Sequence, residues 1–108
     1  MENWKRGDSL IIHIGDNISI IEKDIIAIIN KSSLVNSKNN IKLINSLIEN
    51  GNLVNRIDDK TKSYIIVSEN NGKNNTNKKE KLKLYVSNIS SSSLLKRQKD
   101  WDRREKYV

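Results

Sequence analysis

Residues 10–21 have the sequence LIIHIGDNISII, in which two β-branched runs flank three residues that favour turns. Gly15, Asp16 and Asn17 tolerate positive φ angles and are typical of tight connections between antiparallel strands. The segment therefore predicts a β-hairpin at the beginning of the fold. His13 alternates with Ile12 and Ile14, so we expect its side chain on the opposite face of that hairpin.

Further strands are predicted by the runs that follow. Residues 25–29 are apolar at every position, which is typical of a strand buried on both faces, and we expect them at the heart of the core. Residues 53–57 and 63–67 flank the polar stretch 58–62, a pattern that predicts a second hairpin with a charged tip. Residues 81–86 alternate again and predict a last strand.

Two helices are predicted by a change of period and by capping residues. Between Ser37 and Asn50 the apolar positions follow a helical repeat, with Ser37 placed as N-cap and Gly51 placed to end the helix. The face that should be buried consists of Ile41, Ile44, Leu47 and Ile48. The serines at 90–93 can cap a C-terminal helix that begins at Leu94.

Together these elements predict an α+β fold: a small β-rich domain of two hairpins and a final strand, with one central helix and a C-terminal helix. The 108 residues fit one domain. We expect it to span residues 1–97, with an inserted flexible loop at 69–80 that contains no apolar side chain. Residues 98–108 should form a charged tail, which favourable i,i+4 pairs such as Asp100 with Arg104 predict to be helical.

The composition limits the chemistry and the class of partner. The core must be aliphatic, because 17 Ile, 9 Leu and 5 Val stand against 5 aromatic residues. The net charge of +7 is uneven: residues 1–72 hold 9 basic and 9 acidic side chains, and residues 73–108 hold 11 and 4. Such an excess suits a polyanionic partner. The abundance of Lys, Asn and Ile is equally typical of an AT-rich coding sequence.

No feature of the sequence predicts catalysis, a metal or a cofactor. Cysteine is absent, and His13 is the single histidine, which makes a poor metal site. The serines at 90–93 have no base in a recognisable relation to them, and the acidic residues sit in polar breaks that would not raise their pKa. We therefore expect a protein that is not an enzyme. With no readable signal peptide and no apolar stretch of about 20 residues, the default location is the cytoplasm.

Four segments, in order, carry a resemblance to a known family. They are Ile12–Asp16, Asp24–Ile28, Lys62–Val67 and Tyr85–Arg97, the last with a serine run followed by Leu-Leu-Lys-Arg. In order and spacing the chain resembles the bacterial extracellular matrix regulatory proteins, RemA and RemB, and the serine run is closer to RemB. The similarity covers residues 10–97.

The resemblance implies a fold similar to the LytTR class of DNA-binding domains, assembled into a ring that carries DNA on a basic surface. It also implies a transcriptional role at matrix or biofilm genes. The arginine pair that the family places at the tip of its central hairpin corresponds to Asp59 and Lys60 here, and the basic residue after the threonine is kept as Lys62. A further family arginine falls at Asp24. Two positions have thus become acidic.

The candidate DNA-binding residues are cations that could reach phosphates without reading bases. They are Arg56, Lys60, Lys62, Lys96 and Arg97. Double-stranded DNA is the expected partner, and the alternative is a protein-binding scaffold of the same family, which Asp24 and Asp59 favour. Trp101 could stack on a base, although its position seven residues after Leu94 favours packing.

Self-association is expected as well. The chain has several short β-branched strands and no proline, one of the usual devices that keep exposed strand edges from pairing. Contact between subunits through the first strands would cover such edges. Repeated head to tail, this contact would close into a ring-like homo-oligomer.

Overall fold

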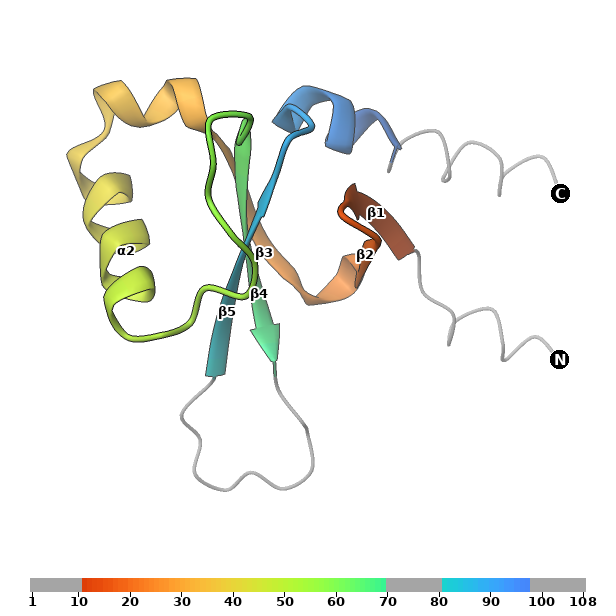
Figure 1. Ribbon diagram of the computed structural model, residues 1–108, viewed down its shortest axis with the longest axis horizontal. Coiled ribbons are helices and arrows are strands. Elements are labelled where there is room, and N and C mark those ends of the chain that lie inside the picture. Colours follow the sequence, from red (N-terminus) through yellow and green to blue (C-terminus); the bar gives the residue numbers. More distant parts are fainter. Residues whose placement is uncertain (1–10, 70–80, 98–108) are drawn as a thin grey trace, which may run out of the picture.

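The computed structural model describes residues 11–69 and 81–97 as a small α+β fold, which confirms the predicted class (Figure 1). In chain order the elements are β1 (Ile11–Gly15), β2 (Ile18–Ile21), the 3₁₀ helix η1 (Glu22–Asp24), β3 (Ile25–Asn30), the 3₁₀ helix η2 (Lys31–Asn36), α2 (Lys38–Glu49), β4 (Ser63–Glu69) and β5 (Lys81–Ser87). Residues 91–97 form a further helix. Glu69, the first residue of the predicted loop at 69–80, belongs to β4. Residues 70–80 of that loop and the predicted tail at 98–108 lie outside the described residues.

The first hairpin forms as predicted. β1 pairs with β2 antiparallel, with Ile11 opposite Ile21. Gly15, Asp16 and Asn17 have φ angles of 102°, 53° and 60°, so all three turn residues occupy the left-handed region that this tight connection requires.

A three-stranded antiparallel sheet of order β3-β4-β5 forms the centre of the fold. β4 is its middle strand and is buried from Ser63 to Val67. The predicted place of residues 25–29 at the heart of the core was wrong, because β3 is an edge strand in which no residue is fully buried. A bulge between Ile25 and Ala27 interrupts its pairing with β4, and the extra residue, Ile26, is 54% exposed.

The central helix forms where its capping residues predict it. The side-chain oxygen of Ser37 accepts a hydrogen bond from the amide of Asn40, and Gly51 follows the helix with a φ of 80°. Ile44 and Leu47 are buried. Ile41, at the N-terminal end of the predicted face, is exposed. The apolar face that packs on the sheet is therefore shorter than predicted.

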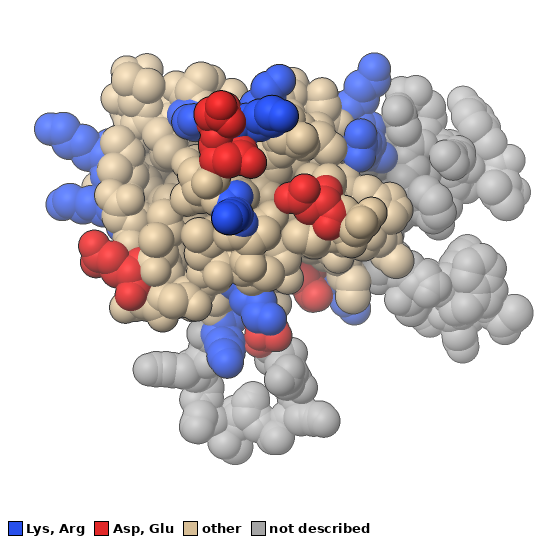
Figure 2. Space-filling view, in the orientation of Figure 1, with Lys and Arg blue, Asp and Glu red and all other residues tan. Residues whose placement is uncertain are grey.

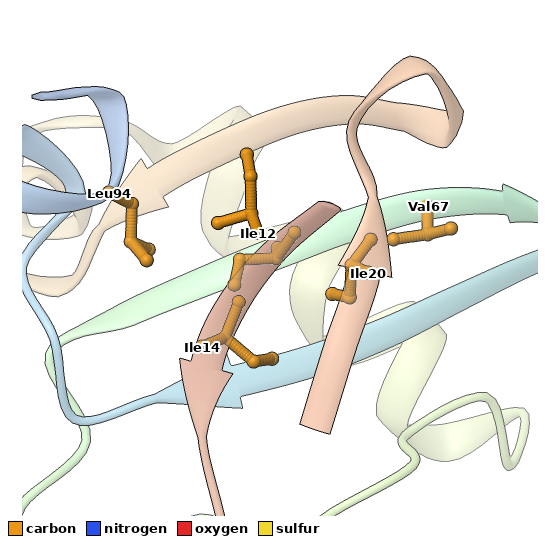
Figure 3. Packing of buried hydrophobic residues seen from close by; sticks show 6 residues of the cluster. Ile12, Ile14, Ile20, Val67 and Leu94 are labelled. Carbon is orange, nitrogen blue, oxygen red and sulfur yellow. The ribbon is translucent and has the colours of Figure 1, made fainter. Parts of the chain in front are cut away.

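Two apolar clusters hold three layers together. The hairpin packs on one face of the sheet, where Ile12, Ile14 and Ile20 meet Ile65, Val67 and Leu94 (Figure 3). α2 packs on the other face, where the cluster comprises Ile44, Leu47, Tyr64, Ile66, Leu84 and Val86. The Ser87 hydroxyl donates to the carbonyl of Ile14 over 2.7 Å, which adds a buried hydrogen bond between hairpin and sheet.

The predicted second hairpin was wrong. Residues 53–57 do not pair with β4; Leu53 instead forms an isolated parallel bridge with Leu84 of β5. The amide of Val54 donates to the carbonyl of Leu84, and the amide of Leu84 donates to the carbonyl of Asn52. The segment after α2 therefore runs along the outer edge of β5.

The C-terminal helix begins three residues earlier than predicted, at residue 91. Ser90 caps it, since its hydroxyl accepts from the amide of Ser93 over 3.3 Å. Leu94 is fully buried and fixes this helix to the hairpin cluster. No helix within residues 11–69 or 81–97 has the length and apolar character to cross a membrane.

Candidate functional site

The polar stretch before β4 forms a fixed turn. The amide of Asp58 donates to the Thr61 hydroxyl over 3.0 Å, and the amide of Lys60 donates to the Asp58 carboxylate over 2.8 Å. Thr61 is buried. The Asp58 carboxylate thus helps to form the turn, and Asp58, Asp59, Lys60 and Lys62 are all exposed. The predicted polar turn is present, but it connects residues 53–57 to β4 without making a hairpin.

This turn places two lysines side by side although 31 positions separate them. The amide of Lys31 donates to the carbonyl of Lys62 over 2.8 Å, and the amide of Lys62 donates to the carbonyl of Ser87 over 2.7 Å. The first hydrogen bond holds the end of β3 against the start of β4, and the second ties Lys62 to the end of β5. Both lysine side chains are exposed.

Lys31 and Lys62 flank a shallow depression with a volume of about 440 Å³. Its lining consists of Asn30, Lys31, Ser32, Val35, Thr61, Lys62 and Ser90. Asn30 ties the walls together, because its side-chain amide donates to the Ser32 hydroxyl and its carbonyl oxygen accepts from the amide of Ser91. The depression therefore joins η2, the 58–62 turn and the beginning of the C-terminal helix in one preformed surface.

Within the described residues, neither Lys31 nor Lys62 forms an ion pair. Lys83 pairs with Glu69 over 3.2 Å, at the far ends of β4 and β5. Figure 2 shows Lys and Arg atoms along the upper edge of the molecule, above the 55–62 segment and the 91–97 helix, with acidic atoms between them. The ammonium groups of Lys31 and Lys62 are therefore available to an anion, next to the carboxylates of Asp58 and Asp59.

The five residues predicted to bind DNA fall into two groups, all exposed. Lys62 lines the depression, and Arg56 and Lys60 belong to the adjoining segment. Lys96 and Arg97 lie in the last described turn of the C-terminal helix, and neither lines the depression. The Arg97 guanidinium donates to the carbonyl of His13 over 2.8 Å, so it also holds the helix against the hairpin.

Lys31 is the residue that sequence reasoning missed. Lys31 follows residues 25–30 and lies 31 positions before Lys62. No local pattern around either lysine indicates that the other lies beside it. A correct pairing of residues 25–30 with residues 63–67 would have found it, because that register extends directly to Lys31 and Lys62.

The other polar groups of the described residues provide weaker candidates for a binding or catalytic site. The His13 side chain lies on the exposed face of β1, as predicted, with its Nδ1 atom 2.8 Å from the Ser19 hydroxyl. Within the parts of the chain that the structure describes, no three His, Cys, Asp or Glu side chains are placed to share a metal ion. Asp24 lines a smaller groove of about 200 Å³ together with Glu69, Lys83 and Tyr85.

Comparisons with protein-family models, with curated proteins and with solved structures give no match for this chain. The resemblance to the matrix regulators and the similarity to the LytTR fold therefore stay predictions from the sequence.

Proposed function

We propose that this chain is a DNA-binding regulatory protein that contacts the phosphate backbone through a lysine surface and acts as a homo-oligomer. The observation that carries the proposal is the fixed pair of Lys31 and Lys62, which lie side by side in the lining of one depression. The backbone hydrogen bond between these residues holds their main chains in place before any ligand binds.

Phosphate contacts of this kind supply affinity without sequence discrimination. Lysine ammonium groups displace counterions from the DNA, and this release makes binding favourable and dependent on salt. Such contacts position a protein but carry no information about base sequence. Arg56 and Lys60 in the adjoining segment, with Lys96 and Arg97 on the C-terminal helix, would extend the contact along the backbone.

The biological setting comes from the family resemblance. In that setting the chain is a cytoplasmic bacterial protein that acts as a homo-oligomer at matrix or biofilm genes. Assembly matters physically, since a few exposed lysines bind weakly and several linked copies multiply the affinity.

A salt titration of binding to random-sequence duplex DNA tests the proposal. We expect Lys31→Glu combined with Lys62→Glu to weaken binding and to lower the slope of log affinity against log salt by roughly two, because each lost phosphate contact removes about 0.9 from that slope. Lys42→Glu is the matched single-charge control, since Lys42 is an exposed lysine of α2 outside the depression. Equal effects of Lys42→Glu and of either single change in the depression would contradict a localised site.

Lys60→Glu combined with Lys62→Glu provides a second, independent variant of the 58–62 turn. It should also weaken binding and flatten the salt dependence, while the fold survives because both side chains are exposed. If the wild-type protein does not bind duplex DNA even at low salt, the DNA-binding proposal is wrong.

The second candidate function is that of a protein-interaction scaffold. One observation favours it: Val35, in the wall of the depression, is 76% exposed, the largest exposure among the large hydrophobic residues of the described chain. A protein partner could cover Val35 and pair its own charges with Asp59 and Lys62. Failure of DNA binding at low salt would make this the leading candidate.

A further inference from the structure

The two edges of the central sheet differ in how they are closed. At the outer edge of β5, the carbonyls of Leu82, Leu84 and Val86 and the amides of Leu84 and Val86 all bond to residues 52–55. The outer edge of β3 has no neighbouring strand within the described part of the chain. Strand addition is therefore blocked at β5 and open at β3.

The register identifies which groups β3 offers at that edge. Lys31 donates to Lys62, and the ladder between β3 and β4 then alternates in steps of two residues. Ala27 and Ile29 consequently face β4, while the amide and carbonyl of Ile28 and the amide of Asn30 point outward.

The side chains of β3 lack the features that keep an edge strand from pairing. Native edges are blunted by charges, above all lysine. β3 has the sequence IIAIIN and contains no charge, whereas β5 contains Lys81 and Lys83. Every residue of β3 is only partly buried or exposed, although five of the six are apolar. β3 is therefore as apolar as a core strand, but its side chains remain partly exposed to solvent.

The charges that flank β3 select the direction of its partner. Asp24 immediately precedes the strand and Lys31 immediately follows it. A second β3 running antiparallel brings the acidic end of one copy to the basic end of the other, and a parallel arrangement brings like charges together. The flanking charges therefore favour pairing of this edge with β3 of a second copy, in the antiparallel direction.

We propose that two copies of the chain pair antiparallel along β3, about a two-fold axis at Ile28. The outward-facing groups of Ile28 then meet those of Ile28 in the second copy, and Asn30 lies opposite the bulged residue Ile26. A shift of the axis to Ala27 would place Lys31 opposite Lys23. The paired sheet buries Ile26 and continues over three strands from each copy, with the two depressions at its opposite ends.

This contact goes beyond the proposed function, which requires assembly but names no contact surface. It can be tested in the absence of DNA, whether or not the chain binds DNA. It also replaces the ring that the family resemblance implies, because a two-fold contact closes at the dimer and a ring needs a repeated head-to-tail contact.

Light scattering coupled to gel filtration tests the surface with two matched variants, Ile26→Lys and Ile11→Lys. Both isoleucines are exposed, at 54% and 59%, and both changes add one positive charge, but only Ile26 lies on β3. We expect the wild type and Ile11→Lys to be dimers and Ile26→Lys to be a monomer with an unchanged circular dichroism spectrum. A wild-type monomer at high micromolar concentration, or a dimer that Ile11→Lys alone dissociates, would overturn the proposal.

A cysteine crosslink tests the register and remains informative if Ile26→Lys fails to fold. The chain contains no cysteine, so Ile28→Cys introduces a single thiol. In a hydrogen-bonded antiparallel pair the two Cα atoms are about 5.5 Å apart, which is within the range that a disulfide spans. Mild oxidation should convert Ile28→Cys to a covalent dimer far faster than Val35→Cys, whose thiol is more exposed but lies off the edge. Equal rates for the two variants would contradict pairing at Ile28.

Discussion

Two asparagine side chains substitute for a missing strand at the edge of β5. The Asn55 amide exchanges two hydrogen bonds with Val86, donating to its carbonyl over 2.9 Å and accepting from its amide over 2.8 Å. This is the pattern that a paired residue of a neighbouring strand would make. Asn52 donates in the same way to the carbonyl of Leu82. A short side chain thus satisfies partly buried backbone groups that would otherwise lose free energy or attract another chain.

We predict that Asn55→Ala lowers the free energy of unfolding by about 1–3 kcal/mol, because it leaves the amide and carbonyl of Val86 without their partner. Chemical denaturation measures the change. Asn45→Ala is the matched control, since Asn45 is an exposed residue of α2, and this change should stay within about 0.5 kcal/mol. A difference between the two variants that is within experimental error would show that water replaces the Asn55 amide at no cost.

At the scale of elements, local signals predicted most of the strands and helices but not their partners, and residues 53–57, predicted as a strand, form only an isolated bridge. The hairpin turn at Gly15 and the capped helix after Ser37 depend on nearby residues, and both formed as predicted. The partner of β4 depends on packing across the whole chain. Residues 53–57 are closer in sequence to β4 than residues 25–30 are, yet β3 is the strand that pairs with it.

An apolar run also does not determine how deeply a strand is buried. β3 and β4 are both rich in isoleucine and neither contains a charge before its last residue, but β4 is the middle strand and β3 is the edge. The same composition suits a strand buried inside one chain and a strand buried between two chains. That ambiguity, which the sequence alone cannot resolve, is the basis of the dimer proposed here.

The join between β4 and β5 supports a prediction about the segment that connects them. Glu69 and Lys81 are paired across the two strands, and their register makes them a hydrogen-bonded pair. A two-residue turn fits after such a pair. We predict that replacing residues 70–80 by Asn-Gly preserves cooperative unfolding, because the ladder from Ser63 to Glu69 is retained in full. Thermal unfolding followed by circular dichroism measures this. Loss of the cooperative transition would mean that residues 70–80 contribute to the core.

At the scale of the whole molecule, the candidate site was predictable only in part. Lys60 and Lys62 were predicted from their place in the polar stretch 58–62, expected as a hairpin tip, and from the family resemblance. Lys31 and the depression require the contact between the ends of β3 and β4, which lies beyond any local pattern. The total charge of +7 indicated a polyanion but could not identify a surface, because all of the basic excess lies after residue 72.

The proposed dimer and the proposed DNA contact make a joint prediction. A dimer paired along β3 presents two copies of the lysine surface, so a duplex that reaches both gains affinity through linkage and releases counterions at both. We expect Ile26→Lys, as a monomer, to bind random duplex DNA at least tenfold more weakly than the wild type at about 0.1 M salt, with a salt slope about half as steep. The added lysine by itself would strengthen binding, so a weaker complex of the folded monomer points to lost assembly. Ile11→Lys carries the same added charge and should bind at least as tightly as the wild type. A monomeric Ile26→Lys that binds with the affinity and slope of the wild type would separate the two proposals: each copy would then bind DNA alone, and pairing along β3 would serve another purpose.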